Sequence, residues 1–448
     1  MTSLEENARA IWQAGVDSVN SEKLTSAAIT YSHHSLQIGT KQYALTSKSR
    51  IFVVGAGKAG SGMARGVLAA LKHSGLSISG WVNVPEDCVQ QIHSIKLHGA
   101  RPAGLNEPTE TGVHGTDQIL RILENAEADD VCICLISGGG SALLPSPISE
   151  ITLSDKQQIT RLLSAAGANI EQLNSVRKKL SRVKGGGLAQ FCQNSRLATL
   201  IISDVLGDPL DIIASGPTVQ DESTIDQAID TIQYFLQPSN PVVQKCLAVL
   251  QHQEAAEHSF VHCHTEVIGN NATAVQAAVL KAEQLGYTTE SKAHVTLEGF
   301  ADELGSQHAE QLRKMKAHGG KRAYISGGEP VVKLADEQIR GDGGRNQQLV
   351  LAALVNQITH SPDLASCLQD AIILAGGTDG EDGPTNAAGA FANQQIIENL
   401  IQRKPDAADH LRRNDAYTFF ELLEGLIICG PTHTNVCDIR VVLTDTTK

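Results

Sequence analysis

Apolar residues recur along this chain in two alternating patterns. Short runs that are almost entirely apolar predict buried strands, as at residues 50–54, 131–136 and 197–203. Between such runs, segments with apolar residues three to four positions apart predict amphipathic helices, as at residues 154–167 and 300–318. Strand, turn, helix and strand in this order are typical of a parallel sheet covered by helices on both faces. The pattern therefore predicts an α/β fold.

The same reasoning places elements along the whole chain. Helices are predicted at residues 4–20, 22–36, 61–75, 111–128, 154–167, 171–182, 223–236, 270–285, 300–318, 347–358 and 392–401. Strands are predicted at residues 50–54, 78–84, 92–98, 131–136, 197–203, 266–269, 288–294, 321–325, 370–374, 425–428 and 439–442.

The length of 448 residues exceeds what one ordinary core organises and predicts at least two domains. Glycine and apolar residues are sparsest around residues 236–265, so the boundary is placed near residue 240. The expected arrangement is an N-terminal α/β domain at 1–240, a C-terminal α/β domain at 241–448, and a cleft between them. Either domain could be discontinuous.

Composition limits the possible partners and the compartment. The 36 basic and 49 acidic side chains give a formal charge of −13, which argues against non-specific nucleic-acid binding. No apolar stretch reaches the roughly 18–20 residues that cross a bilayer, and the N-terminus has no signal-peptide pattern. The nine cysteines show no disulfide spacing. We therefore expect a cytoplasmic protein with reduced thiols that binds neither membranes nor nucleic acid.

Seven glycine-rich segments interrupt the chain, several of them directly after a predicted strand. Glycine lets backbone N–H groups approach an anion closely, so this repetition predicts phosphate binding. Acidic residues occur in the same loops, and carboxylates beside phosphate sites indicate an enzyme that uses a metal-bound nucleotide. The segments are 53–62, 135–142, 183–189, 203–218, 325–330, 341–347 and 374–385, and the acids include Asp204, Asp208, Glu329, Asp379 and Asp382.

The first loop, GAGKAG, follows a strand and opens a helix. Gly55 and Gly57 match the first two glycines of the dinucleotide pattern G-x-G-x-x-G. Acids just after the next strand, Glu86 and Asp87, keep a dehydrogenase interpretation open. Lys58 adds an ammonium at the helix N-terminus and favours an anion site, whereas the alternative is a solvated lysine beside a packing turn. The spacing does not fit a Walker A loop.

The second loop carries three glycines between two serines. Gly138, Gly139 and Gly140 could leave successive N–H groups free for an anion, and Ser137 and Ser141 could add hydroxyl donors. A nucleophilic serine is the alternative, but the G-x-S-x-G elbow is missing. A plain strand-to-helix turn is the third possibility.

A basic segment at 174–187 runs into a further glycine triplet. Arg177 and Lys184 are seven residues apart, a spacing that predicts that they share one helix face. The segment is either an anion-binding surface or a solvated charged face.

Acidic and amide side chains follow several later strands. Asp204 comes directly after the strand at 197–203, where a carboxylate can hold Mg²⁺ or cap a helix. Glu329 ends another strand, and Arg345 with Asn346 opens a helix. The arginine can bind a carboxylate or phosphate through its bidentate guanidinium.

The last dense loop, GGTDGEDGPTN, also follows a strand. Gly377, Thr378 and Asp379 stand at its start, where a backbone N–H, a hydroxyl and a carboxylate could serve phosphate or metal.

These motifs, in this order, resemble the class II glycerate kinases, the glycerate 2-kinase family, some members of which are labelled hydroxypyruvate reductase. The resemblance covers about residues 5 to 445. It rests on GAGKA, SGGGSALLPSP, LNSVRKKLSRVKGGGLA, SDVLGDPLDIIASGPT, SGGEP, GGRNQ, AGGTDGEDGPTNAAGA and GPTHTNVCD.

The resemblance implies two α/β domains around a cleft, the first Rossmann-like with a mostly parallel sheet. It implies phosphorylation of D-glycerate to 2-phosphoglycerate with ATP and Mg²⁺, in a monomer or homodimer. The expected catalytic residues are Lys58, Arg345 and Asp204. Nucleotide phosphates are expected at Gly55, Gly57, Ser137, Gly138, Gly139, Gly140, Ser141, Gly377, Thr378 and Asp379; the substrate at Lys58, Arg177, Arg345 and Asn346; and the metal at Asp204, Glu329 and Asp379.

Two other functions stay open. An NAD(P)H-dependent hydroxypyruvate reductase would need one dinucleotide loop and an acid–base residue, but none of the further glycine-rich acidic loops. A sugar-phosphate sensor would bind a ligand without turnover.

Overall fold

The computed structural model describes residues 3–253, 259–296 and 298–446. The chain forms two compact units, and both are discontinuous in sequence. The parallel-sheet unit comprises Ser21–Ser203 and Asp208–Ile268, and the mixed-sheet unit comprises Met1–Asn20, Asp204–Gly207 and Gly269–Lys448. This division differs from the sequence-based one, since residue 240 lies inside the parallel-sheet unit.

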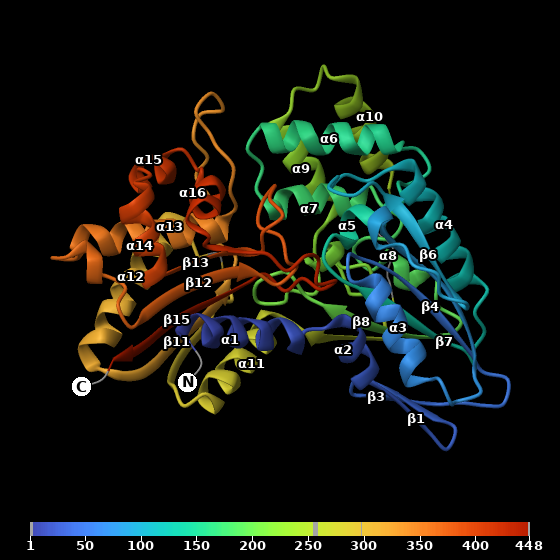
Figure 1. The fold of residues 1–448 in the computed structure, drawn as a ribbon. Helices are drawn as coiled ribbons and strands as arrows, with labels where there is room; N and C mark the ends of the chain where they lie inside the picture. Colours follow the sequence, from blue (N-terminus) through green and yellow to red (C-terminus); the bar gives the residue numbers. More distant parts are fainter. Residues whose placement is uncertain (1–2, 254–258, 297, 447–448) are drawn as a thin grey trace. The chain divides into compact units, whose positions relative to one another are not determined.

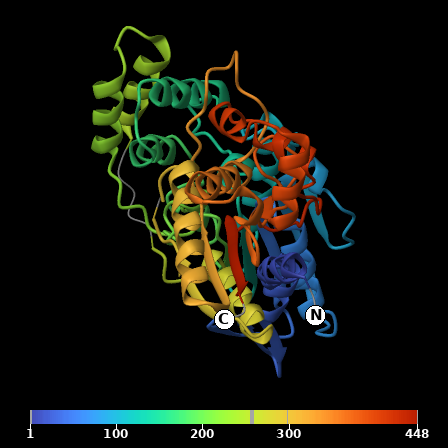
Figure 2. The same ribbon diagram turned by 60° about the vertical axis from the view of Figure 1, so that its left-hand side comes forward.

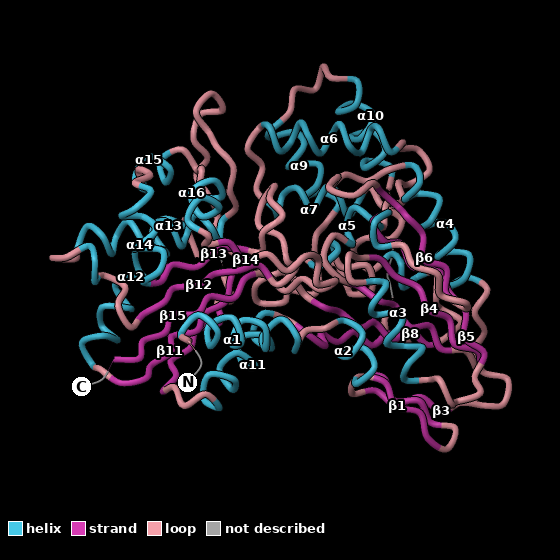
Figure 3. Tube along the Cα trace, in the orientation of Figure 1, coloured by secondary structure: helices cyan, strands magenta, loops and turns pink. Residues whose placement is uncertain are grey.

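The parallel-sheet unit is built on a six-stranded sheet in the order β6-β5-β4-β7-β8-β9. Its strands are among those drawn in magenta in Figure 3. The pairings from β6 to β8 are all parallel, which confirms the mostly parallel sheet expected for the first domain. The strands are β4 (Arg50–Ala56), β5 (Ser77–Pro85), β6 (Ile95–Arg101), β7 (Val131–Ile136), β8 (Arg196–Ile202) and β9 (Cys263–Gly269).

Helices cover both faces of this sheet, and the alternating side chains of β5 show which helix lies on which face. Val82 and Val84 pack against Gly60, the first residue of α3 (Gly60–Ala70). Asn83 points to the opposite face and lies against Gly115 of α4 (Glu110–Glu124). Successive strand residues face opposite sides, so α3 and α4 lie on different faces.

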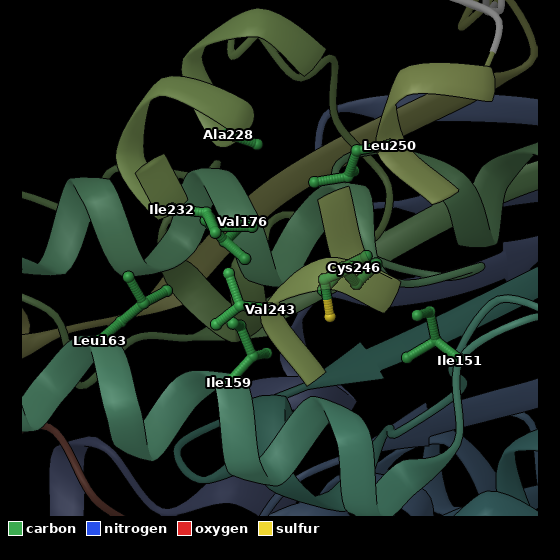
Figure 4. Close-up of a cluster of buried hydrophobic side chains, with 10 residues drawn as sticks. Ile151, Ile159, Leu163, Val176, Ala228, Ile232, Val243, Cys246 and Leu250 are labelled. Atoms are coloured by element: carbon green, nitrogen blue, oxygen red, sulfur yellow. The ribbon is translucent and has the colours of Figure 1, made fainter. Parts of the chain in front are cut away.

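Four helices of this unit have a hydrophobic core of their own. They are α6 (Leu153–Ala165), α7 (Ile170–Lys179), α9 (Ile225–Phe235) and α10 (Pro241–His252). Their apolar side chains meet in one cluster that includes Leu163, Val176, Ile232 and Val243 (Figure 4). Helix α10 was not predicted, although Asn240 caps it and Pro241 occupies its first turn.

The helix predicted at 22–36 is wrong beyond its first turns. Helix α2 ends at Ala27, and β1 (Ile29–Ser32) pairs antiparallel with β2 (Ser35–Ile38), which pairs with β3 (Lys41–Ala44). His33 and His34 both have positive φ, of 49° and 60°, as a two-residue type I′ hairpin turn requires. The β-branched and aromatic residues of β1 favour the strand.

The mixed-sheet unit holds a second six-stranded sheet in the order β10-β11-β15-β12-β13-β14. Only β10 and β11 are parallel, so the parallel pattern expected to continue is wrong here. The C-terminal strand β15, red in Figures 1 and 2, lies inside the sheet between β11 and β12. The strands are β10 (Thr288–Ala293), β11 (Gly320–Gly328), β12 (Ala371–Gly377), β13 (Gly389–Asn393), β14 (Leu426–Ile427) and β15 (Asp438–Thr446).

Helices also cover both faces of this second sheet (Figure 1). Helices α1 (Leu4–Ser18) and α11 (Asn271–Gln284) pack together on one face, and α12 (Ala301–His318) and α13 (Arg345–His360) on the other. The remaining helices of the chain are α2 (Ser21–Ala27), α5 (Gly140–Leu143), α8 (Gly187–Gln190), α14 (Gln394–Arg403), α15 (Ala407–Arg412) and α16 (Ala416–Leu423). Among all these helices of the described chain, none is both long and apolar enough to cross a membrane.

Candidate active site

The first two glycine loops are joined at the carboxyl ends of the neighbouring strands β4 and β7. The backbone N–H of Ala59 donates to the Ser137 hydroxyl at 3.0 Å, and that of Lys58 donates to the Gly138 carbonyl at 2.9 Å. A Cβ on Gly57 would lie 2.0 Å from the Ser137 Oγ, so only glycine permits this approach. These contacts hold the two loops together at the sheet edge.

This joining changes the expected role of the GAGKAG turn. The N–H groups of Gly57 and Gly60 also donate to protein carbonyls, those of Asn83 and Gly57. The N–H groups of residues 57–60 therefore have protein acceptors, and Gly55 lies within β4. The group of this turn that can attract an anion is the Lys58 ammonium.

A second cation, which the sequence did not suggest, lies beside the SGGGS loop. Gly139, with φ of 77°, brings the backbone to Lys58 and Arg101: a Cβ there would lie 3.5 Å from Lys58 Cγ and 3.4 Å from Arg101 Nη2. Arg101 is buried, and burial lowers its pKa. Its Nε has no hydrogen-bond partner among the described residues. Gly140 follows as the first residue of α5.

The end of this loop meets the basic segment. The Ser141 hydroxyl lies 2.7 Å from Arg177 Nη2, 2.6 Å from Lys184 Nζ and 3.1 Å from the Ser215 hydroxyl. We call these four residues the serine–cation cluster. Helix α7 ends at Lys179, so Arg177 and Lys184 meet through a turn of the chain and not along one helix face. The predicted shared helix face is therefore wrong, and anion binding by this segment stays a prediction.

The neighbouring lysines of the segment have a structural role instead. Lys178 Nζ lies 3.1 Å from Asp221 Oδ1, and Lys179 Nζ lies 2.8 Å from Asp221 Oδ2. Lys178 and Asp221 are both buried, and Lys178 also pairs with Asp211 at 3.3 Å. The basic run thus divides into paired and unpaired cations.

In the mixed-sheet unit, Arg345 opens α13 and binds two carboxylates. Its Nε and Nη2 donate to Asp438 at 2.7 and 3.0 Å, and its Nη1 donates to Glu329 at 2.7 Å. We call these three residues the arginine–carboxylate cluster. Burial lowers the pKa of Arg345, but the two carboxylates outweigh it and raise that pKa. The sheet register explains the meeting, since Asp438 of β15 is opposite both Gly328 of β11 and Gly377 of β12.

Asn346 follows Arg345 and is buried. Its backbone N–H and that of Gln347 donate to Asp382 at 3.0 and 2.8 Å, and its side-chain amide donates to the same carboxylate at 3.2 Å. Burial raises the pKa of Asp382 to about 7, against the opposing effect of these N–H donors. Asn346 therefore positions Asp382 at the start of α13, and its contact with substrate stays a prediction.

Asp204 belongs to the mixed-sheet unit, although β8, which precedes it, belongs to the other unit. Its backbone carbonyl accepts from the Cys437 thiol at 3.0 Å, and Glu329 Oε2 lies 3.9 Å from the same sulfur. Burial raises the pKa of this thiol, and the carboxylates of Glu329, Asp438 and Asp204 raise it further. Asp204 and Glu329 therefore both lie next to Cys437.

The loop after β12 is tied to the start of β15. The buried Thr378 hydroxyl donates to the Cys437 carbonyl at 2.7 Å and accepts from the Val436 N–H at 2.8 Å. The Gly377 N–H donates to Ala388. Thr378 and Gly377 thus join strands, and of this predicted trio only Asp379 has a partly exposed side chain.

The donor set for Mg²⁺ can be tested against these positions. Within the described residues, no group of three or more His, Cys, Asp or Glu side chains is arranged to hold a metal. Mg²⁺ beside a nucleotide usually takes one or two carboxylates and completes its shell with phosphate oxygens and water. Asp204 and Glu329, which both lie next to Cys437, fit that smaller requirement, and the place of Asp379 in a metal site stays a prediction.

Several site residues were not assigned by sequence reasoning. Asp438 and Cys437 end the motif GPTHTNVCD, and an acid directly before a buried strand was the signal available. Ser215 stands in the ASGPT motif, while Arg101 carries no local signal beyond its place at the end of β6.

Comparisons with known proteins agree with this architecture. Residues 7–250 match a family model described as a domain of unknown function (DUF4147), and residues 322–438 match the MOFRL family. The glycerate kinase of Homo sapiens is 33% identical over 497 residues, covering 98% of this chain and 93% of the human protein. A putative hydroxypyruvate reductase of Agrobacterium vitis is 34% identical over 402 residues, covering 88% and 99%.

Two crystal structures share the fold over nearly the whole chain. That of a glycerate kinase from Thermotoga maritima has a TM-score of 0.83 at 29% identity and covers 98% of this chain and 99% of its own. That of a protein from Pyrococcus horikoshii has a TM-score of 0.82 at 28% identity and covers both chains fully. The two-part α/β fold predicted from sequence is confirmed.

Proposed function

Because this chain belongs to the glycerate kinase family, we propose that it transfers the γ-phosphoryl group of ATP to D-glycerate and forms 2-phosphoglycerate. The observation that carries the proposal is the arginine–carboxylate cluster, where Arg345 is fixed by Asp438 and Glu329 next to Asp204. A fixed cation beside carboxylates provides charge neutralisation and metal ligands together, and phosphoryl transfer depends on both.

Catalysis is proposed to use Lys58, Arg345 and Asp204. Lys58 and Arg345 carry the positive charges that stabilise the transferring phosphoryl group. Asp204 and Glu329 would hold Mg²⁺, which when bound neutralises charge on phosphate oxygens. One of these acids accepts the proton of the attacking substrate hydroxyl.

The remaining predicted positions divide by chemistry. Lys58 and Arg101 lie beside the loop from Ser137 to Gly140, and we propose that this loop binds nucleotide phosphate, with Gly55 and Gly57 allowing the close approach of the neighbouring strand end. Asp379 is proposed as a further contact for the nucleotide or its metal, with Gly377 and Thr378 positioning its loop. We expect small-molecule substrates and a monomer or homodimer.

The alternative is an NAD(P)H-dependent hydroxypyruvate reductase, and the Agrobacterium vitis relative's name is the reason to test it. The joined glycine loops count against it, because the N–H groups that a dinucleotide pyrophosphate would need at residues 57–60 donate within the protein.

One experiment decides between these functions. The purified chain is incubated with ATP, Mg²⁺ and D-glycerate, and the product is identified by ³¹P NMR. The proposal expects ADP and 2-phosphoglycerate in equal amounts, and 3-phosphoglycerate would correct the position of transfer. Loss of nicotinamide absorbance with hydroxypyruvate, and no ADP release with glycerate, would replace the kinase by the reductase.

A further inference from the structure

The serine–cation cluster gathers two basic side chains around neutral hydroxyls. Lys184 Nζ lies 2.6 Å from the Ser141 hydroxyl, 3.0 Å from the Ser141 carbonyl and 3.4 Å from the Ser215 hydroxyl. Arg177 Nη2 lies 2.7 Å from the same Ser141 hydroxyl. Two cations thus approach one hydroxyl oxygen from different segments of the chain.

Neither cation has an ion-pair partner among the described residues, although Lys184 is buried and Arg177 is partly buried. Lys184 is 5% exposed, and burial lowers its pKa well below the usual value, with Arg177 and Lys156 lowering it further. A buried positive charge without an opposite charge destabilises the fold because burial removes its hydration. The nearby acids do not relieve this cost, because Asp211 and Asp221 bind Lys178 and Lys179 instead. An anionic ligand would relieve it.

The backbone beside the cluster is held in an uncommon conformation. Ala214 and Ser215 have φ of 51° and 63°, and neither is glycine. Non-glycine residues in this left-handed region are strained and are retained where the surrounding structure requires them. Here the conformation brings the Ser215 hydroxyl to Ser141 and Lys184.

We propose that Ser141, Arg177, Lys184 and Ser215 form the subsite that binds the carboxylate of the hydroxy-acid substrate. This inference rests on the proposed function and chooses between two cations that sequence left open for the carboxylate, Arg177 and Arg345. Arg345 already binds two carboxylates, whereas Arg177 binds none of the described ones.

A carboxylate fits this subsite better than a nucleotide phosphate does. A guanidinium, an ammonium and two hydroxyls supply enough donors for two oxygens bearing one negative charge. A triphosphate brings Mg²⁺, which needs carboxylate ligands, and the cluster itself contains none.

The test uses the full chain with Lys184→Met, and Arg182→Met as the matched control. Arg182 is a partly exposed cation two residues away that pairs with Asp117. In steady-state assays of ADP release, Lys184→Met should raise the KM for D-glycerate about 10- to 100-fold, the effect of a lost charged hydrogen bond. The KM for ATP should change less than twofold, and Arg182→Met should change neither.

A direct binding measurement separates failure of this inference from failure of the proposed function. D-glycerate without ATP should raise the melting temperature of the wild type and Arg182→Met, but not that of Lys184→Met. If the wild type releases no ADP, the kinase proposal fails and this pattern alone decides the subsite. Ser215→Ala, which retains both cations, should raise the glycerate KM about threefold to tenfold and serves if Lys184→Met does not fold.

Three results would overturn the inference. A raised KM for ATP with an unchanged KM for glycerate would assign the cluster to nucleotide phosphate, as would a melting shift with inorganic phosphate but not with glycerate. Unchanged values of both constants in folded Lys184→Met and Ser215→Ala would show that the cluster binds no substrate.

Discussion

Asp438 binds the Arg345 guanidinium through two hydrogen bonds, from Nε at 2.7 Å and from Nη2 at 3.0 Å, and its side chain is fully buried. The third interaction of Arg345, with Glu329 at 2.7 Å, involves a partly exposed carboxylate. Asp438 therefore fixes the plane of the guanidinium, while Glu329 occupies a position that a ligand or metal can reach. The two acids should differ in what their removal does.

Asp438→Asn should reduce both stability and turnover. The substitution keeps the shape of the side chain but removes the negative charge opposite Arg345. The free energy of unfolding should fall by about 2 kcal/mol, less than for a fully buried pair, because the guanidinium is partly solvated. Urea denaturation should show this loss, and kcat should fall at least tenfold because Arg345 is no longer held. Glu329→Gln is the comparison: it should lower kcat with less than half the loss in unfolding free energy. Equal stability losses in both variants would contradict the assigned difference.

Lys58→Ala should lower kcat about 100-fold, the scale of a lost electrostatic stabiliser of the transition state. Its side chain is partly exposed beside Gly139 of the SGGGS loop, so its removal should not disturb the hydrophobic core. Lys72→Ala removes an exposed lysine after the same helix and should retain full activity. Wild-type turnover in Lys58→Ala would remove this residue from the catalytic set.

Mg²⁺ dependence should distinguish the predicted metal ligands. Asp204→Asn and Glu329→Gln should each raise the Mg²⁺ concentration for half-maximal rate about tenfold, since each removes one charged ligand. Asp379→Asn tests the third predicted ligand in the same titration, with exposed Glu381→Gln as its control. An unchanged titration in Asp379→Asn would leave that residue a loop-forming role only.

The Lys178–Asp221 pair should affect stability and not substrate binding. Asp221→Asn leaves the buried Lys178 ammonium with only the exposed Asp211 carboxylate at 3.3 Å, which should lower the free energy of unfolding by up to about 3 kcal/mol. The KM for D-glycerate should stay within twofold of wild type, in contrast to the effect of Lys184→Met. A KM change as large as that of Lys184→Met would contradict this prediction, because it would show that the Lys178–Asp221 pair also affects substrate binding.

Lys156 should make the stability of the fold depend on pH. Burial lowers its pKa from 10.5 to about 7, and the nearby charge of Arg177 acts in the same direction. A lowered pKa favours the neutral lysine in the folded state, so this contribution to stability is present above pH 10.5 and is lost as the pH falls to about 7. Lys156→Met should therefore be more stable than wild type at pH 7, by a few kcal/mol at most.

The measurement is the difference in unfolding free energy between Lys156→Met and wild type across this pH range. The difference should be largest near pH 7 and should shrink as the pH rises toward 10. A difference that is independent of pH would contradict the prediction, because it would show that protonation of Lys156 does not destabilise the fold.

The sequence by itself determined most strands of the parallel sheet and placed glycine-rich, acidic segments at strand ends, but it missed β1 to β3 and helix α10. Apolar runs such as Val131–Ile136 are fully buried, and local patterns of this kind act within a few residues. It also placed the candidate catalytic residues Lys58, Arg345 and Asp204 in glycine-rich segments, because the glycines that shape these segments are adjacent to them in the chain.

Only the tertiary structure decided which of these residues meet. Arg345 and Asp438 are 93 positions apart and come together because β15 pairs antiparallel with both β11 and β12, which no local pattern specifies. The same holds for Ser141, Arg177, Lys184 and Ser215, which a turn and a positive-φ segment bring together. Pairing of cations with acids is likewise a property of contacts, so the sequence could not separate Lys178 from Lys184.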